Sequence, residues 1–211
     1  KESRMADIWR VLCIHLGTPP ERFDWQWEDK DKNFHRAGTM TPQEFVAEYV
    51  TVDWEDYVCL VHDPRNPVYQ TYTVDCLQNV SGGPPVVYLN IPIAEMKAIT
   101  QRLLEEGTPV WMGCDVGQQM DRKRGLWDAE LFESQALYGV EYGLDKDSRL
   151  RFGQTMMTHA MLFTGVDVVD GQPRRWRVEN SWGDDNGIKG FYTMNDGWFD
   201  EYMFEIVAPS S

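Results

Sequence analysis

The stretch Val178-Glu179-Asn180-Ser181-Trp182-Gly183 decides the fold class, together with Met157-Thr158-His159-Ala160-Met161 upstream of it. His159 and Asn180 are 21 residues apart (180 − 159 = 21), and each lies in an apolar run typical of a β-strand. An asparagine oxygen can accept the proton on one ring nitrogen of a histidine, while the other nitrogen faces a thiol. The pattern therefore indicates the last two members of a Cys-His-Asn triad, with Trp182 able to lie over their contact.

The spacing and flanking residues resemble the C-terminal half of a papain-like cysteine peptidase. The longer sequences 158–161 and 177–183 resemble the bleomycin hydrolase and bacterial aminopeptidase C branch in particular. The resemblance covers most of the chain from about Val86 onward and is weaker before that residue. It implies an α+β, papain-like fold, of which this chain holds the antiparallel barrel-like half and part of a family-specific insertion.

The resemblance implies a role for each of three residues. His159 is the general base and acid, which takes the thiol proton and later protonates the leaving amine. Asn180 orients the imidazole, and Trp182 shields the contact from water, although simple core packing would explain the tryptophan equally well. The implied activity is that of an intracellular cysteine aminopeptidase, which hydrolyses N-terminal peptide bonds of peptide substrates by thiol acyl transfer.

The cysteines do not match the nucleophile of the resembled family. That cysteine occurs in a Cys-Trp context at a helix N-terminus, more than about a hundred residues before the histidine. None of the four cysteines in this chain is followed by Trp: Cys13, Cys59, Cys76 and Cys114. We therefore expect the nucleophile and the oxyanion-hole glutamine to lie in the N-terminal half of the same protein. The family's C-terminal arm is expected to lie outside this chain as well, and the chain alone is expected to be inactive.

Two other functions stay open at this point. The chain could be a non-catalytic assembly or binding module derived from such a peptidase, although the joint retention of His159, Asn180 and Trp182 argues against it. It could also be a separate hydrolase that uses Cys114 as its nucleophile. Cys114 lies in an apolar strand pattern, which offers neither a helix dipole nor oxyanion amides to activate a thiol. Rapid alkylation of Cys114 would favour this last function.

Composition limits the partners. The chain has 211 residues and a formal net charge of −14, which would repel nucleic acid. Four cysteines without close pairing argue against a disulfide framework and fit a reducing cytosol. No apolar run approaches the roughly 18 residues of a membrane span. We expect a cytoplasmic protein without cofactor or metal, whose partners are peptide substrates, its own N-terminal half and further copies, since the resembled branch forms homohexamers.

The remaining polar candidates have simpler explanations. Three further histidines lie on a helix, in a polar loop and beside a proline-rich turn, and none has metal-ligand spacing: His15, His35 and His62. Asp115 and the pair Asp184-Asp185 could bind a substrate amine or a cation. Solvated loop charge is the simpler interpretation for both, because the remaining ligands of a calcium loop are missing.

The patterns along the chain predict two parts. Residues 1–80 are expected to be a mixed helical and β insertion of the oligomerisation type, and residues 81–211 the papain-like β-barrel half that carries His159 and Asn180. Ser81-Gly82-Gly83-Pro84-Pro85 is the expected boundary, and Asp170-Gly171-Gln172-Pro173 a hairpin turn. Helices are predicted over 5–16, 41–49, 93–106 and 129–137, and strands over 23–27, 58–61, 69–74, 110–114, 158–169, 174–180, 190–194 and 202–207.

Overall fold

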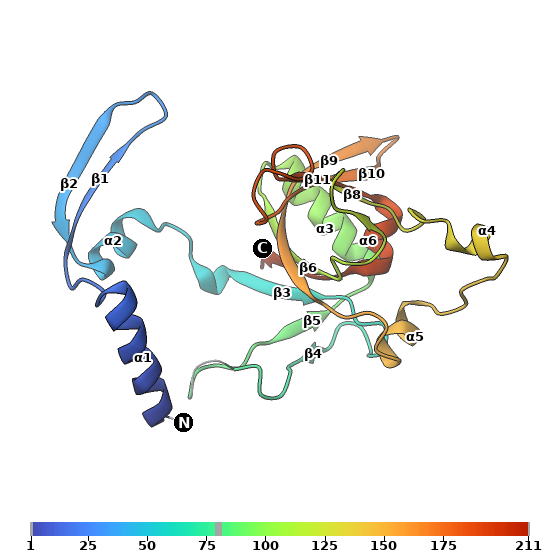
Figure 1. The fold of residues 1–211 in the computed structure, drawn as a ribbon, viewed down its shortest axis with the longest axis horizontal. Coiled ribbons are helices and arrows are strands. Elements are labelled where there is room, and N and C mark those ends of the chain that lie inside the picture. The colour runs from blue at the N-terminus through green and yellow to red at the C-terminus, as the bar shows by residue number, and fades with distance from the viewer. Residues whose placement is uncertain (1, 79–81, 211) are drawn as a thin grey trace. The chain divides into compact units, whose positions relative to one another are not determined.

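The computed structural model describes residues 2–78 and 82–210 of the chain. The chain divides into two compact units, Lys1–Trp54 and Glu55–Ser211 (Figure 1). The sequence instead placed the division at residues 81–85, of which Ser81 lies outside the described residues. The difference arises because strands before residue 81 pair with strands that follow it, including one near the C-terminus, so they belong to the second unit.

The first unit contains two helices and a two-stranded antiparallel sheet: α1 Glu2–Leu16, β1 Phe23–Glu28, β2 Phe34–Met40 and α2 Pro42–Tyr49. The predicted capping box starts α2, because the Glu44 amide donates to Thr41 Oγ1 at 3.1 Å and the Thr41 amide donates to Glu44 Oε2 at 2.7 Å. Trp25 of β1 contacts Phe45 of α2 edge to face, with ring centroids 4.9 Å apart. A small aromatic cluster therefore joins the sheet to α2.

The second unit is built on a sheet that has ten strands within the described residues, in the order β4-β5-β3-β12-β6-β9-β10-β11-β8-β7. Neighbours are antiparallel except for the pairs β3–β5 and β8–β11, which are parallel. The strands are β3 Tyr57–Val61, β4 Thr71–Tyr72, β5 Tyr88–Asn90, β6 Val110–Cys114, β7 Met120–Asp121, β8 Leu126–Trp127, β9 His159–Val169, β10 Gln172–Glu179, β11 Phe191–Asn195 and β12 Met203–Pro209.

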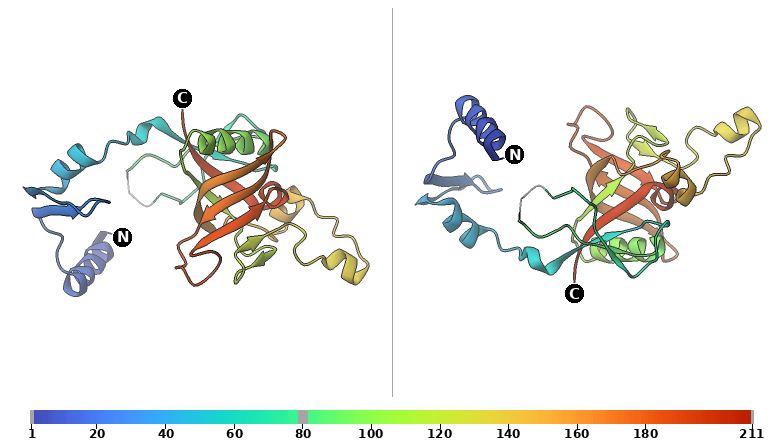
Figure 2. Two further views of the ribbon diagram at one scale, coloured as in Figure 1. Left: turned by 90° about the horizontal axis from the view of Figure 1, so that it is seen from above. Right: turned by 90° about the horizontal axis from the view of Figure 1, so that it is seen from below.

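Two helices cover one face of this sheet. α3 (Ile93–Glu105) packs on β6, β9 and β12, and α6 (Asp196–Tyr202) packs on β10, β11 and β12 (Figure 2). The core lies between these helices and the sheet, and the helix residues Met96, Trp198 and Phe199 are fully buried in it. The second unit also contains two short helices, and a 3-10 turn lies where the two units join in sequence: α4 Ser134–Tyr138, α5 Lys146–Arg151 and the turn Trp54–Asp56.

The hairpin of β9 and β10 sets the register that matters for the site. Asp170 and Gly171 both have positive φ, 52° and 76°, as a two-residue type I′ turn requires. The turn is therefore shorter than predicted, since Gln172 already pairs with Val169. Leu162 pairs with Glu179, and continuing this register puts Asn180 opposite Met161 (162 + 179 − 180 = 161). His159 is then a diagonal neighbour of Asn180 on the same face of the sheet.

The α+β class expected from the sequence is confirmed, but several elements differ from the expected ones. α4 is shorter than the predicted helix over 129–137, and β4 is shorter than the predicted strand over 69–74. The sequence patterns did not predict the helices α5 and α6 or the strands β2, β5, β7 and β8. Among the described residues, no helix combines the length and apolar character that a membrane crossing requires.

Candidate active site

The predicted contact between His159 and Asn180 is confirmed. His159 begins β9, Asn180 directly follows β10, and the distance from His159 Nε2 to Asn180 Oδ1 is 3.0 Å. Asn180 is buried, with 9% of its surface exposed. Its backbone amide donates to the Gly190 carbonyl at 3.1 Å, which holds the asparagine against the loop that precedes β11. The two side chains are thus fixed by strand pairing and by the backbone around Asn180.

The hydrogen-bond pattern around Asn180 determines which imidazole nitrogen carries the proton. The Ser181 backbone amide donates to the same Asn180 Oδ1 at 2.8 Å. A backbone amide can only donate, so the oxygen of the carboxamide must lie on this side. His159 Nε2 faces that oxygen and therefore carries the hydrogen in the neutral ring. Its Nδ1 is left with a lone pair, which can accept a proton from a thiol.

Trp182 lies against the imidazole, as predicted. The Trp182 and His159 rings are stacked with centroids 5.0 Å apart and planes 26° apart. On the core side Trp182 meets Tyr192 edge to face at 6.2 Å, and the Arg122 guanidinium carbon lies 4.5 Å from its ring centroid. The Trp182 side chain therefore packs on the core and covers the His159 ring at the same time.

Asp115 anchors the segment that leads into His159. Its carboxylate is 5% exposed and accepts hydrogen bonds from Thr155 Oγ1 at 2.8 Å and from the Met156 amide at 3.3 Å. The Thr158 amide donates to the Cys114 carbonyl at 2.9 Å, which continues the pairing of β6 and β9. The sequence left Asp115 between a ligand for a cation and a solvated loop charge. The structure contradicts solvation, since the carboxylate is buried and bonded to the chain some forty residues ahead.

Cys114 is the cross-strand partner of His159 but is not placed as a nucleophile. It is fully buried in the core, and burial together with the charge of Asp115 raises the pKa of its thiol far above the ordinary value. The thiolate is the nucleophilic form, so this environment opposes reaction. Within the described residues, no hydrogen bond links the Cys114 thiol to His159. The hypothesis of a separate hydrolase that uses Cys114 therefore has no support in the geometry.

The other histidines are not part of the hydrogen-bonded His159–Asn180 pair. His35 Nε2 is 2.9 Å from Asp29 Oδ2, and His62 Nδ1 is 2.9 Å from the Ile91 carbonyl oxygen. Burial lowers the pKa of His62, and His15 lies exposed on α1. Asp184 and Asp185 are exposed, in agreement with the simpler interpretation of a solvated loop. Among the described residues, no three His, Cys, Asp or Glu side chains are grouped as metal ligands.

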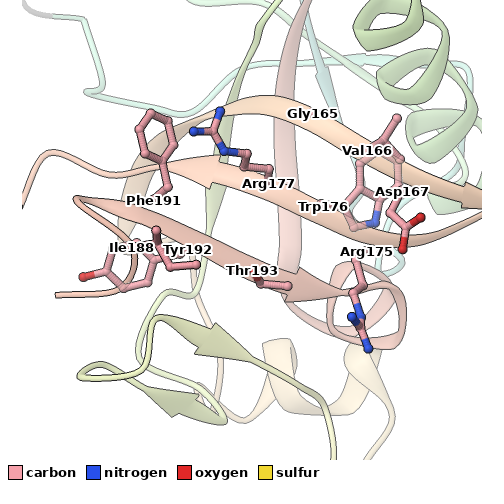
Figure 3. A pocket seen from close by; sticks show the side chains of 10 residues that line it. All are labelled: Gly165, Val166, Asp167, Arg175, Trp176, Arg177, Ile188, Phe191, Tyr192 and Thr193. Carbon is pink, nitrogen blue, oxygen red and sulfur yellow. The ribbon is translucent and has the colours of Figure 1, made fainter.

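Two of the cavities in the second unit are lined by strands of this sheet. One of about 410 Å³ lies on β9, β10 and β11, where Arg177 covers the ring of Phe191 (Figure 3). The residues that line it do not include His159 or Asn180. The second, of about 690 Å³, is lined by Met157, two residues before His159, and by the buried Glu205. Glu205 was missed by the sequence patterns, because an isolated acidic residue in an apolar strand gives no indication of which side it faces.

Comparison with known proteins identifies the relatives of this chain. A family model described as the Peptidase C1-like family matches residues 1–210. The chain is 46% identical to bleomycin hydrolase of Homo sapiens, with 99% of this chain and 48% of that protein covered. It is 38% identical to aminopeptidase C of Listeria innocua, with the same shares of 99% and 48%.

A solved structure has the same fold. The crystal structure of PepW from Lactobacillus rhamnosis HN001 superposes with a TM-score of 0.94 at 40% identity, over 99% of this chain and 47% of that one. The chain therefore spans about half the length of the relatives that it matches. Because the family model covers nearly every residue and the fold agrees with the sequence relationship, the chain belongs to the Peptidase C1-like family.

Proposed function

We propose that this chain supplies the general base and its orienting residue to a cysteine aminopeptidase. The observation that carries the proposal is the His159–Asn180 hydrogen bond, which leaves Nδ1 as the free proton acceptor. In this role His159 takes the proton of a thiol, and the resulting imidazolium protonates the amine that leaves from the substrate. Asn180 keeps the ring in one tautomer throughout, and Trp182 keeps water from the hydrogen bond between them.

The nucleophile is proposed to come from the N-terminal half of the same protein, together with the oxyanion-hole glutamine. Two observations support this. Cys114, the cysteine that pairs in register with His159, is fully buried with a raised thiol pKa. The relatives named bleomycin hydrolase and aminopeptidase C are about twice as long as this chain, which covers 48% of each. The chain alone is then expected to be inactive, because triad members act as a unit.

The proposed setting is the cytoplasm, with peptides as substrates and with further copies of the chain as partners, up to a homohexamer. The exposed apolar side chains of α1 support the need for such a partner: Ile8 is 52% exposed and Trp9 55% exposed. Nucleic acid is not a proposed partner, since the formal charge is −14.

The test is hydrolysis of aminoacyl-aminomethylcoumarins by the chain alone and after mixing with a separately produced N-terminal half. Activity is expected only after mixing. His159→Ala should abolish it, and Asn180→Ala should lower it, because the imidazole loses its fixed tautomer. His35→Ala, which removes a histidine of the other unit, is the matched control and should leave the rate unchanged.

Two outcomes would contradict the proposal. Hydrolysis by the purified chain alone, lost in a Cys114→Ala variant, would make Cys114 the nucleophile after all. No activity in a complex that forms correctly would favour the alternative, a non-catalytic assembly or binding module derived from a peptidase. Alkylation mapped by mass spectrometry adds an independent readout, since Cys114 in the folded chain is expected to react slowly.

A further inference from the structure

A basic turn joins β7 to β8 in a chain whose formal net charge is −14, and it contains Arg122, Lys123 and Arg124. All three side chains are exposed. The Arg124 guanidinium lies 3.6 Å from the Asp121 carboxylate. Within the described residues, Arg122 and Lys123 form no ion pair with a carboxylate. The basic turn therefore presents two cations that an anionic ligand can bind.

Backbone contacts fix the basic turn against the loop that follows Asn180. The Gly187 amide donates to the Lys123 carbonyl at 3.2 Å, and the Thr193 amide donates to the Gly125 carbonyl at 2.8 Å. A Cβ added to Gly125 would lie 2.5 Å from the Gly187 Cα, so this close approach of two backbones requires glycine. The basic turn is therefore held in one position beside the candidate active site.

Trp182 connects the basic turn to the His159–Asn180 pair. The Arg122 guanidinium carbon lies 4.5 Å from the centroid of the Trp182 ring, and the centroid of the His159 imidazole lies 5.0 Å from it. Arg122 thus contacts the same indole as the general base. A guanidinium that stacks by its face keeps the N–H donors in its plane, where they can bind a carboxylate.

The chemistry of the proposed reaction brings the leaving part of a substrate to the same place. His159 gives its proton to the amine that leaves, so this amine must reach the imidazole. An extended peptide advances roughly 3.3 Å per residue, so a leaving segment of one or two residues ends within about 7 Å of that amine. Its terminal carboxylate is then within reach of Arg122, which is one indole away from the imidazole.

We propose that Arg122 and Lys123 bind the terminal carboxylate of a short leaving segment, so that the assembled enzyme prefers dipeptides and tripeptides with a free C-terminus. The placement of the substrate rests on the proposed peptidase function, whereas the affinity of the basic turn for a carboxylate does not. Because both side chains are exposed, the ion pair contributes modestly and is weakened by salt.

The first experiment measures kcat/KM of the complex with the N-terminal half for Leu-Gly-Gly and for Leu-Gly-Gly amide, by release of leucine. These peptides differ only in the charge at the C-terminus. At about 20 mM salt, the ratio of the two values is expected to be about three- to fivefold higher than in Arg122→Gln, and about 0.5 M salt should remove this difference. Lys123→Gln should lower the ratio in part.

Two further variants show whether the charge of Arg122 is responsible. Arg122→Lys, which keeps the charge, should retain part of the preference for the free C-terminus. Arg175→Gln, which removes an exposed arginine of β10, is the matched control and should retain all of it. An equal loss of kcat/KM for both peptides in Arg122→Gln would make Arg122 only a support for Trp182 and would overturn the proposal.

The second experiment needs no peptidase activity. The 211-residue chain is titrated at pH 7 with glycylglycine, the segment that leaves from Leu-Gly-Gly, and with glycylglycine amide, and NMR follows the Trp182 Nε1–H and Arg122 Nε–H signals. Glycylglycine is expected to bind about three- to fivefold more tightly. Equal binding of the two ligands, or an unchanged preference in Arg122→Gln, would overturn the proposal.

The two experiments separate this proposal from the proposed function. His159→Ala should keep the preference for glycylglycine, because the general base takes no part in binding the carboxylate. A complex that binds glycylglycine selectively but hydrolyses neither peptide would count against the peptidase function alone. An active complex whose rates for the two peptides respond equally to Arg122→Gln would count against the carboxylate site alone.

Discussion

Helices α1 and α6 show how differently the two units of this chain use their tryptophans. α1 has 15 residues and an apolar periodicity that predicts it from the sequence, yet none of its residues is buried in the described structure. α6 has seven residues, contains a glycine and was not predicted, yet it buries Trp198 and Phe199 completely. The spacing of apolar residues thus identifies a helix such as α1 even where nothing covers it. Packing on a sheet stabilises a short helix such as α6, which its intrinsic helix propensity alone would not stabilise.

The largest test of this difference is a pair of tryptophan substitutions. Trp198→Ala should cost about 3–5 kcal/mol of unfolding free energy, because it opens a cavity in the core. It also removes the hydrogen bond from Trp198 Nε1 to the Gln118 carbonyl, 2.8 Å long. Trp9→Ala on α1 should change stability by no more than about 0.5 kcal/mol. Urea unfolding measures the free energy of unfolding of both variants. Equal losses of unfolding free energy would mean that α1 is buried against a partner in solution.

A pair of aspartates sharpens the comparison at the level of hydrogen bonds. Asp115→Ala leaves the Thr155 hydroxyl and the Met156 amide without their acceptor, and should cost about 1–3 kcal/mol. Asp29→Ala in the first unit removes a carboxylate that is only partly buried and accepts from His35 and Asn33. It should cost less, because water can replace much of what the carboxylate provides. Hydrogen exchange should locate the Asp115 effect at residues 155–159; exchange that is unchanged there would remove Asp115 as the anchor of His159.

The two units should also respond to pH in opposite directions. Glu205 has its pKa raised from 4.5 to about 7. Its contribution to stability is therefore present below pH 4.5 and lost as the pH rises through 7, at no more than about 1.4 kcal/mol per pH unit. Asp29 has its pKa lowered from 3.8 to about 2, first of all by its hydrogen bond with His35. Its contribution is present above pH 3.8 and lost as the pH falls through 2.

Urea unfolding between pH 2 and pH 8 checks both directions. Glu205→Gln should flatten the decline between pH 4.5 and pH 7, and Asp29→Asn should flatten the one at acid pH. Slopes that stay the same in both variants would show that other groups control the pH dependence.

The smallest effect concerns two glycines of the second unit. Gly113→Ala forces the Met157 sulfur to move, since the new Cβ would lie 2.3 Å from it, and should cost about 1 kcal/mol. Gly117→Ala meets no atom within 4 Å and should be neutral or slightly stabilising. Thermal unfolding measures both. An unaffected Gly113→Ala variant would show that the Met157 side chain has another position available.

The sequence predicted the parts of the site that depend on local pattern and on recurring chemistry. The His159–Asn180 contact follows from two strands joined by a turn at Asp170-Gly171, and both the strands and the turn were readable. Asp115 and Glu205 were not readable as buried groups. Asp115 depends on partners forty residues away, and Glu205 lies next to an irregularity in strand pairing, where two steps on β12 match one step on β6. A β-bulge or a hydrogen bond between distant parts of the chain produces no periodic pattern of apolar residues, so neither is predicted by such patterns.

The stacking of Trp182 has a practical consequence. Its indole ring touches the His159 imidazole and lies under the Arg122 guanidinium, so its excited state is exposed to charge on both neighbours. When an imidazole in contact with an indole is protonated, the fluorescence of the indole is quenched. The difference in emission between the chain and its Trp182→Phe variant therefore reports the charge of His159 optically. The same signal should change when a thiolate is brought to Nδ1, which would let assembly of the site be followed in real time without substrate.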